Sequence, residues 1–131
     1  LDNTLKSVER IAKGNGFDSF LMFNVYAQRA TRPDDMERVC NSALHEENRK
    51  AFRYLLSLSE TPAIWAAWGN IIEKRDYLMD CMRDFAADGQ AANAQWFTAG
   101  PLLKSGHPHH PLYLKSTTAL QPFDIDAYLC R

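Results

Sequence analysis

Apolar residues recur at helical spacing in several stretches of the chain. Between residues 5 and 12 they return every three or four positions, and glycines follow, so we expect a first helix that ends near Lys13. Residues 44–58 carry an apolar stripe opposite a charged one, which predicts a longer second helix. Asn70 and Glu73 are spaced as a capping pair, which predicts the start of a third helix.

Three short apolar runs are typical of strands. They cover residues 17–25, 63–68 and 95–99, and glycine or proline lies close to each. The first run does not alternate with polar residues, which indicates a strand covered on both faces. A short helix is expected over residues 124–129. Strands that alternate with helices predict a three-layer α/β sandwich with a short parallel sheet.

Composition narrows the class of protein. The 131 residues are 46% hydrophobic, which is enough for one packed core, so we expect a single domain over residues 1–131. The formal net charge of -1 argues against a broad cationic face for nucleic acid, although a local basic groove stays open. No apolar run reaches the roughly 20 residues that span a membrane.

The cysteines and the first residue add two expectations. Cys40, Cys81 and Cys130 are widely spaced and form no CxxC pair, so we expect neither structural disulfides nor a zinc knuckle. This pattern favours a protein of the reducing cytoplasm. No metal or other cofactor is predicted. The chain begins at Leu1 rather than Met, and three strands are few for such a sheet. We therefore expect that an N-terminal strand is absent from this chain.

Candidate binding residues follow the predicted strands. In open parallel sheets, ligands bind beyond the carboxyl ends of the strands. Asn24 and Tyr26 end the first predicted strand, and Trp68 ends the second. The amide of Asn24 can donate and accept at once, which suits the edge of a nucleobase, although it could equally brace a neighbouring loop. Trp68 could stack on a ligand or belong to the core.

The third strand leads into residues 104–114, which we call the histidine loop. Three of the four histidines lie there, between prolines that prevent a helix. His107 and His110 could serve as general acids or bases, could bind a metal, or could simply pack and cap the loop. Lys104 and Lys115 flank them and could receive a phosphate, or could be solvated lysines. A catalytic or binding pocket at this loop is the preferred interpretation.

Several short segments together resemble a known family. They are Asp2-Asn3-Thr4, the run that ends in Asn24, residues 30–33, Glu47-Asn48, residues 67–69 and above all the Gly-His-Pro-His-His-Pro-Leu-Tyr-Leu stretch at 106–114. Over almost its whole length the chain resembles the microbial family catalogued as domain of unknown function 1643. Members of that family also carry an upstream strand that ends in Asn-Pro-Ser, and this sequence begins after that point.

A more distant resemblance is to the uracil-DNA glycosylase superfamily. Those proteins place an asparagine, a Trp-Gly and a His-Pro loop on successive strand ends, in the order seen here for Asn24, Trp68 and His107. The resemblance implies a glycosylase-like fold in which Asn24 reads a base edge and a loop histidine stabilises charge on the base. It also implies that Leu112 or Tyr113 probes the base stack.

These observations lead to one functional hypothesis and one alternative. The hypothesis is a protein that recognises a nucleobase, a nucleotide or nucleic acid, extending to glycosylase-like hydrolysis. Its predicted pocket contains Asn24, Trp68, His107 and His110, with Tyr26, Lys104 and Tyr113 as further ligand-binding residues. The alternative is a non-catalytic domain that senses a ligand or binds another protein.

Overall fold

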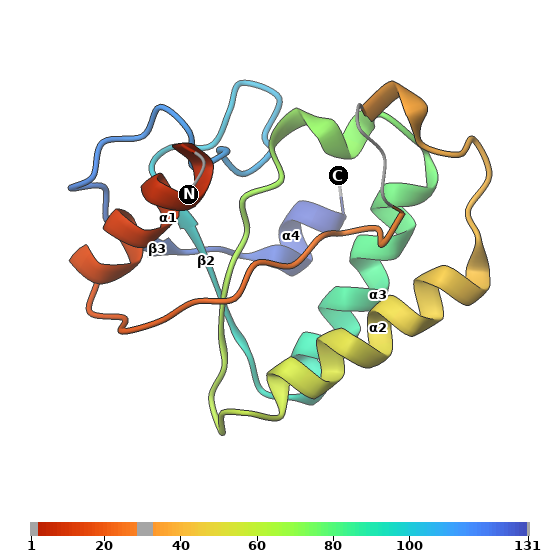
Figure 1. Ribbon diagram of the computed structural model, residues 1–131, viewed down its shortest axis with the longest axis horizontal. Helices are drawn as coiled ribbons and strands as arrows, with labels where there is room; N and C mark the ends of the chain where they lie inside the picture. The colour runs from red at the N-terminus through yellow and green to blue at the C-terminus, as the bar shows by residue number, and fades with distance from the viewer. Residues whose placement is uncertain (1–2, 29–32, 131) are drawn as a thin grey trace.

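A small mixed sheet runs through the middle of the protein, in a computed structural model that describes residues 3–28 and 33–130 (Figure 1). Its strands are β1 (Ala63–Trp65), β2 (Gln95–Ala99) and β3 (Leu120–Pro122), in the order β1-β2-β3. Strands β1 and β2 are parallel, with Ile64 opposite Trp96. Strand β3 is antiparallel to β2, with Thr98 opposite Gln121. The expected parallel pairing is therefore confirmed for β1 and β2, and the sheet as a whole is mixed.

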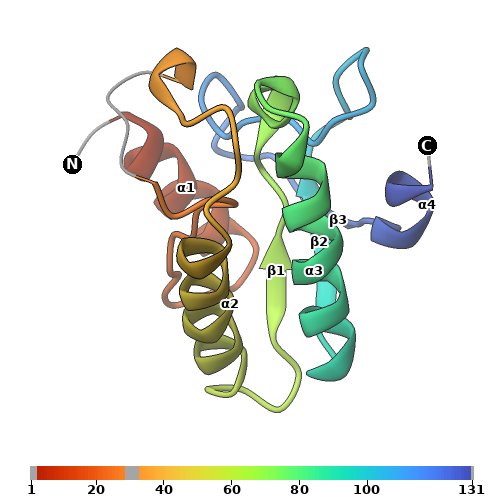
Figure 2. The same cartoon turned by 90° about the vertical axis from the view of Figure 1, so that its right-hand side faces the viewer.

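Helices lie on both sides of this sheet. In chain order they are α1 (Asn3–Gly14), η1 (Pro33–Asp35), α2 (Ser42–Leu56), η2 (Gly69–Glu73), α3 (Tyr77–Ala91) and α4 (Ile125–Leu129). Helices α2 and α3 lie side by side against one face, and α1 lies on the opposite side (Figures 1 and 2). The predicted first, second and terminal helices are confirmed. None of the described helices is both long and apolar enough to cross a membrane.

One hydrophobic cluster joins the two large helices to the sheet and to α4. Its buried members are Tyr26, Phe52, Leu56, Ala66, Ile72, Leu78, Cys81, Met82, Phe85, Ala86, Trp96, Ile125 and Tyr128. Each large apolar side chain in such a cluster contributes about 1.5–3 kcal/mol by leaving water. The cluster thereby fixes the position of α4, whose Tyr128 forms part of the site described below.

The prediction of a strand over residues 17–25 is wrong. This segment crosses from α1 toward α2 as an irregular coil (Figure 1). Leu21 and Met22 are 67% and 53% exposed. Phe23 instead anchors the segment, with its ring 5.0 Å from Phe52 and 5.6 Å from Phe85. A continuous apolar run has no period of its own, and here it is held by aromatic packing rather than by strand pairing.

The predicted capping pair is also wrong. Asn70 and Glu73 lie in the short helix η2, and α3 begins only at Tyr77. The side-chain oxygen of Asn70 accepts a hydrogen bond from the hydroxyl of Ser105. The carboxylate of Glu73 is bonded to His107. Both side chains therefore hold the histidine loop in place instead of starting a helix.

Candidate functional site

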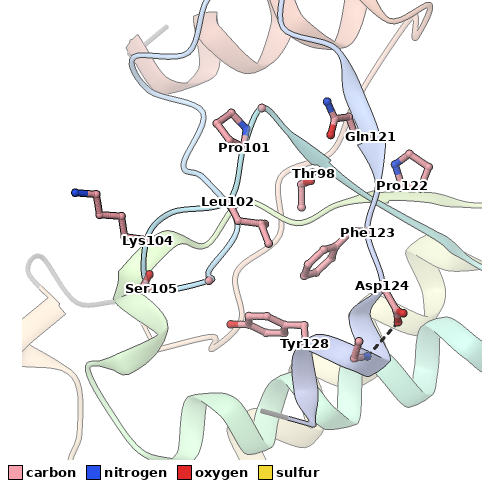
Figure 3. A pocket seen from close by; sticks show the side chains of 13 residues that line it. Thr98, Pro101, Leu102, Lys104, Ser105, Gln121, Pro122, Phe123, Asp124 and Tyr128 are labelled. Atoms are coloured by element: carbon pink, nitrogen blue, oxygen red, sulfur yellow. Dashed lines mark hydrogen bonds between the residues drawn. The ribbon is translucent and has the colours of Figure 1, made fainter.

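A cleft of about 670 Å³ opens where β2 ends, between the histidine loop, β3 and α4 (Figure 3). Its lining residues are Thr98, Gly100, Pro101, Leu102, Lys104, Ser105, Gly106, Gln121, Pro122, Phe123, Asp124, Ala127 and Tyr128. Leu102 and Phe123 point toward one another across the cleft, and the ring of Tyr128 lies beside them. The cleft is thus lined by aromatic and apolar side chains together with a few polar ones, which is common for small-molecule sites.

Backbone hydrogen bonds hold the histidine loop at the mouth of this cleft. The amide of Leu103 donates to the carbonyl of His107 at 2.9 Å, and the amide of Gly106 donates to Leu103 at 2.8 Å. The amide of Gly69 donates to the carbonyl of Pro108 at 2.9 Å. Gly69 has a φ of +61°, which residues with a Cβ rarely adopt. The loop is therefore tied to the segment that follows β1.

A chain of four side chains runs from the cleft to the surface. The indole nitrogen of Trp68 donates to the hydroxyl of Tyr128 at 3.0 Å. The same hydroxyl lies 2.7 Å from Nδ1 of His107, whose Nε2 lies 2.8 Å from Oε2 of Glu73. His107 is only 2% exposed, whereas the side chain of Glu73 is 63% exposed. The imidazole is thus buried between Tyr128, which lines the cleft, and the carboxylate of Glu73, which faces water.

For a neutral imidazole, donor and acceptor chemistry sets the direction of these bonds. An indole N–H can only donate, and an ionised carboxylate can only accept. The neutral imidazole that satisfies both ends carries its hydrogen on Nε2, donates it to Glu73 and accepts the hydroxyl hydrogen of Tyr128 on Nδ1. In that arrangement every hydrogen in the chain points away from Trp68 and toward Glu73.

His110 has a different environment from His107. Its Nδ1 accepts a hydrogen bond from the amide of Leu112 at 3.2 Å. The pKa of His110 is lowered from its ordinary value by burial of the ring and, to a smaller extent, by the neighbouring His109. Both effects favour the neutral form of His110. It does not belong to the residues that line the cleft.

The remaining predicted site residues lie in several places. Lys104 lines the cleft, and its side chain extends outward at the rim (Figure 3). The backbone oxygen of Asn24 accepts from the side chain of Asn48 in α2 at 3.0 Å. Tyr26 is buried, and its hydroxyl accepts from the amide of Asn41 at 2.8 Å. Tyr113 is 91% exposed and lies outside the cleft lining.

The structure thus brings some of the predicted residues together and separates others. Trp68 and His107 meet through Tyr128, and Lys104 shares the cleft with that tyrosine. Asn24 and Tyr26 are bonded instead to α2 and to the residue that caps it.

Sequence reasoning missed the C-terminal wall of the site. Phe123, Asp124 and Tyr128 line the cleft from the end of β3 and from α4. Aromatic residues in a short terminal helix are usual core residues, so the sequence carried no signal for Tyr128. The spacing of Glu73 from Asn70 predicts a helix cap, and only the distance from Glu73 to His107 shows that it lies beside the site. In the part of the chain that is described, no three His, Cys, Asp or Glu side chains are grouped to hold a metal ion.

These features define an α/β protein with a small mixed sheet and a cleft at the end of its central strand. The chain belongs to the family described as protein of unknown function (DUF1643), whose model matches residues 1–112. Comparisons with the curated proteins and with the solved structures gave no match. The family match includes the histidine loop as far as Leu112, whereas Phe123 and Tyr128 lie beyond the matched residues.

Proposed function

We propose that the cleft recognises a nucleobase or a nucleotide. The observation that carries this proposal is that two aromatic rings and a lysine surround one cleft. The rings of Phe123 and Tyr128 lie 5.4 Å apart, and Phe123 is only partly buried. Lys104 stands at the rim of the same cleft. An aromatic wall offers a base a surface to stack on, and the ammonium group offers a partner for a phosphate.

Polar groups around the cleft also fit this class of ligand. Thr98, Gln121 and Asp124 contribute a hydroxyl, an amide and a carboxylate to the lining. Oxygen Oδ1 of Asp124 accepts from the amide of Ala127 at 3.0 Å, so the carboxylate is held in a fixed position at the start of α4. Such groups can pair with the hydrogen-bonding edge of a base.

The resemblance to uracil-DNA glycosylases extends the proposal to nucleic acid and to hydrolysis of the bond between base and sugar. In this proposal, His107 stabilises charge on the base from beside the cleft. Trp68 holds the hydroxyl of Tyr128 in place through its indole N–H. Tyr113, on the exposed side of the same loop, would contact a longer nucleic acid. Asn24 and His110 lie outside the cleft lining and would contribute only to the outer part of such an interface. Tyr26 is buried and would support the fold rather than contact the ligand.

Calorimetric titration with AMP, UMP and the corresponding nucleosides tests the binding proposal. Lys104→Ala should weaken binding of the monophosphates about three- to tenfold and leave the nucleosides unchanged, because an exposed charge pair with phosphate is lost. Lys115→Ala is the matched control, since this exposed lysine lies outside the cleft lining and should have no effect.

A second substitution tests the stacking surface. Phe123→Leu keeps an apolar side chain but removes the ring face, and it should weaken both nucleosides and nucleotides about tenfold. Equal binding by the parent protein and by this variant, or no heat with any of the four ligands, contradicts the proposal. The domain would then be assigned to a different ligand or to a protein partner.

A further inference from the structure

The hydrogen-bonded chain beside the cleft has the arrangement of a proton carrier. We infer that Glu73, His107 and Tyr128 form a proton relay that makes the cleft a hydrolytic site. This inference rests on the proposed function for its substrate class, which is nucleosides and nucleotides. Tyr128 is the catalytic residue in it, and His107 and Glu73 are positioning residues that act through Tyr128.

Position relative to the cleft separates Tyr128 from His107. Tyr128 is 7% exposed and lines the cleft, whereas His107 is 2% exposed and does not belong to the lining. The phenol hydroxyl, which is bonded to Nδ1 of His107, is the group through which the imidazole would exchange a proton with a bound molecule. The two bonds of the relay, at 2.7 and 2.8 Å, are within the range needed for proton transfer between side chains.

Hydrolysis at this relay needs no reactant other than water and the substrate. A water molecule in the cleft gives a proton to the oxygen of Tyr128 while the hydroxyl proton of Tyr128 moves to Nδ1 of His107. The oxygen of that water forms the new bond to the substrate, and the leaving group departs with the electrons of the bond that breaks. The proton then returns from His107 through Tyr128 to the leaving group, so the protein ends in its starting state.

The partners of the relay favour each stage of this transfer. The carboxylate of Glu73 orients Nε2–H of His107 and stabilises the imidazolium that forms, as the third member does in nucleophile–base–carboxylate arrangements. The indole N–H of Trp68 donates to Tyr128 and stabilises negative charge on the phenol oxygen during the transfer.

The position of the imidazole hydrogen tests the relay without any substrate. Long-range ¹⁵N–¹H correlation spectra should show that the neutral ring of His107 carries its hydrogen on Nε2. The Nδ1 resonance should shift in Tyr128→Phe, which removes the hydroxyl that Nδ1 accepts from. A neutral ring with its hydrogen on Nδ1 overturns the inference, because Tyr128 could not then pass a proton to it.

Turnover tests the relay in the same preparations. AMP, UMP, adenosine and uridine are incubated with the protein, and free base and inorganic phosphate are measured. Glu73→Gln should lower kcat at least about 100-fold with little change in KM, because the charge that stabilises the imidazolium is lost while the ligand contacts remain. Tyr128→Phe should abolish turnover. Tyr54→Phe is the matched control, since Tyr54 is 65% exposed on α2 and should keep the parent rate.

The outcomes distinguish this inference from the proposed function. Binding without release of base or phosphate, or full activity in Glu73→Gln, rejects the relay and leaves the binding proposal standing. No binding of any of the four compounds rejects the proposed function, and the position of the imidazole hydrogen still decides whether the relay exists. Glu73→Gln keeps the test valid if Tyr128→Phe fails to fold, because Glu73 is largely exposed.

Discussion

Two tryptophans three positions apart differ in what their indole nitrogens bind. Nε1 of Trp68 donates to Tyr128 at 3.0 Å. Nε1 of Trp65 is buried and has no hydrogen-bond partner within the described residues. A buried N–H that lacks a partner has already lost its hydration without compensation, whereas a satisfied one contributes about 1 kcal/mol.

Replacing each tryptophan by phenylalanine should therefore have unequal effects. Trp68→Phe should lower the free energy of unfolding by at least about 1 kcal/mol more than Trp65→Phe, because only Trp68 loses a hydrogen bond and leaves Tyr128 without its donor. Urea denaturation followed by circular dichroism measures both. A greater loss for Trp65→Phe than for Trp68→Phe would contradict this account.

The cysteines should differ strongly in reactivity. The pKa of Cys81 is raised to about 12, first by burial and then by the neighbouring Cys40 thiol. At pH 8 the reactive thiolate of Cys81 is then on the order of one part in 10⁴. In a short pulse of iodoacetamide, the exposed Cys130 should be labelled and Cys81 should stay unlabelled until the protein is denatured. Peptide mass spectrometry measures this, and equal labelling in the native protein would refute the assignment.

At the scale of elements, one buried carboxylate joins the two large helices. Asp88 in α3 is 7% exposed and receives two hydrogen bonds from Arg49 in α2, at 2.8 and 3.0 Å. This pairing raises the pKa of Arg49, chiefly because its guanidinium donates a hydrogen bond to the carboxylate of Asp88. A bidentate contact of this kind fixes the relative position of the helices.

Asp88→Asn should lower the free energy of unfolding by about 2–3 kcal/mol, because the half-buried guanidinium of Arg49 loses its counter-charge. Glu46→Gln is the matched control. It removes the charge of Glu46, which pairs with Arg53 at 3.2 Å while Arg53 also reaches Asp88 at 3.5 Å. The side chains of Arg53 and Glu46 are 42% and 50% exposed, so the effect should be below about 0.5 kcal/mol. Chemical denaturation of both variants measures the difference, and a similar effect of the two substitutions would argue against the role of Asp88.

The junction between β1 and the histidine loop depends on one glycine. Gly69 has a φ of +61°, and a Cβ there would lie 3.7 Å from Cβ of His110, so space is available but the backbone conformation is unfavourable. Gly69→Ala should lower the melting temperature, with a loss of about 1–2 kcal/mol. Gly14→Ala, at the end of α1 in ordinary van der Waals surroundings, should be neutral or stabilising. Calorimetry of both variants decides, and a tolerated Gly69→Ala would mean that the junction can adjust.

The elements that could be predicted from the sequence are those whose pattern is local. Strand β2 has the predicted bounds, and α1 ends within one residue of the expected position. The run at 17–25 has the composition of a strand, but whether a strand forms depends on a partner with free backbone groups, which composition does not encode. Strand β3 is three residues long and ends in a proline, so it has almost no local signature.

The same limit applies to the site. The sequence singled out the histidine loop because histidines between prolines are unusual there, and the structure does place that loop beside a cleft. Tyr128 and Glu73 could not be found in this way, because their roles follow from distances of 2.7 and 2.8 Å to His107 across 21 and 34 residues of sequence.

At the scale of the whole molecule, stability should vary from the sheet outward. Strand β2 is paired on both sides, whereas the segment at 17–25 pairs with none of the strands in the described residues. In hydrogen exchange followed by mass spectrometry, peptides that contain residues 96–99 should exchange slowest and peptides that contain residues 18–25 should exchange among the fastest. Strong protection over residues 18–25 would show that this segment is held by more than the ring of Phe23.

The exposure of Glu73 has a consequence for the proposed relay. Tyr128 lines the cleft, whereas the side chain of Glu73 at the other end of the chain is 63% exposed. Dissolved ions can therefore reach this carboxylate while a molecule occupies the cleft. The support that Glu73 gives to His107 should then weaken at high ionic strength, whether or not the cleft is filled.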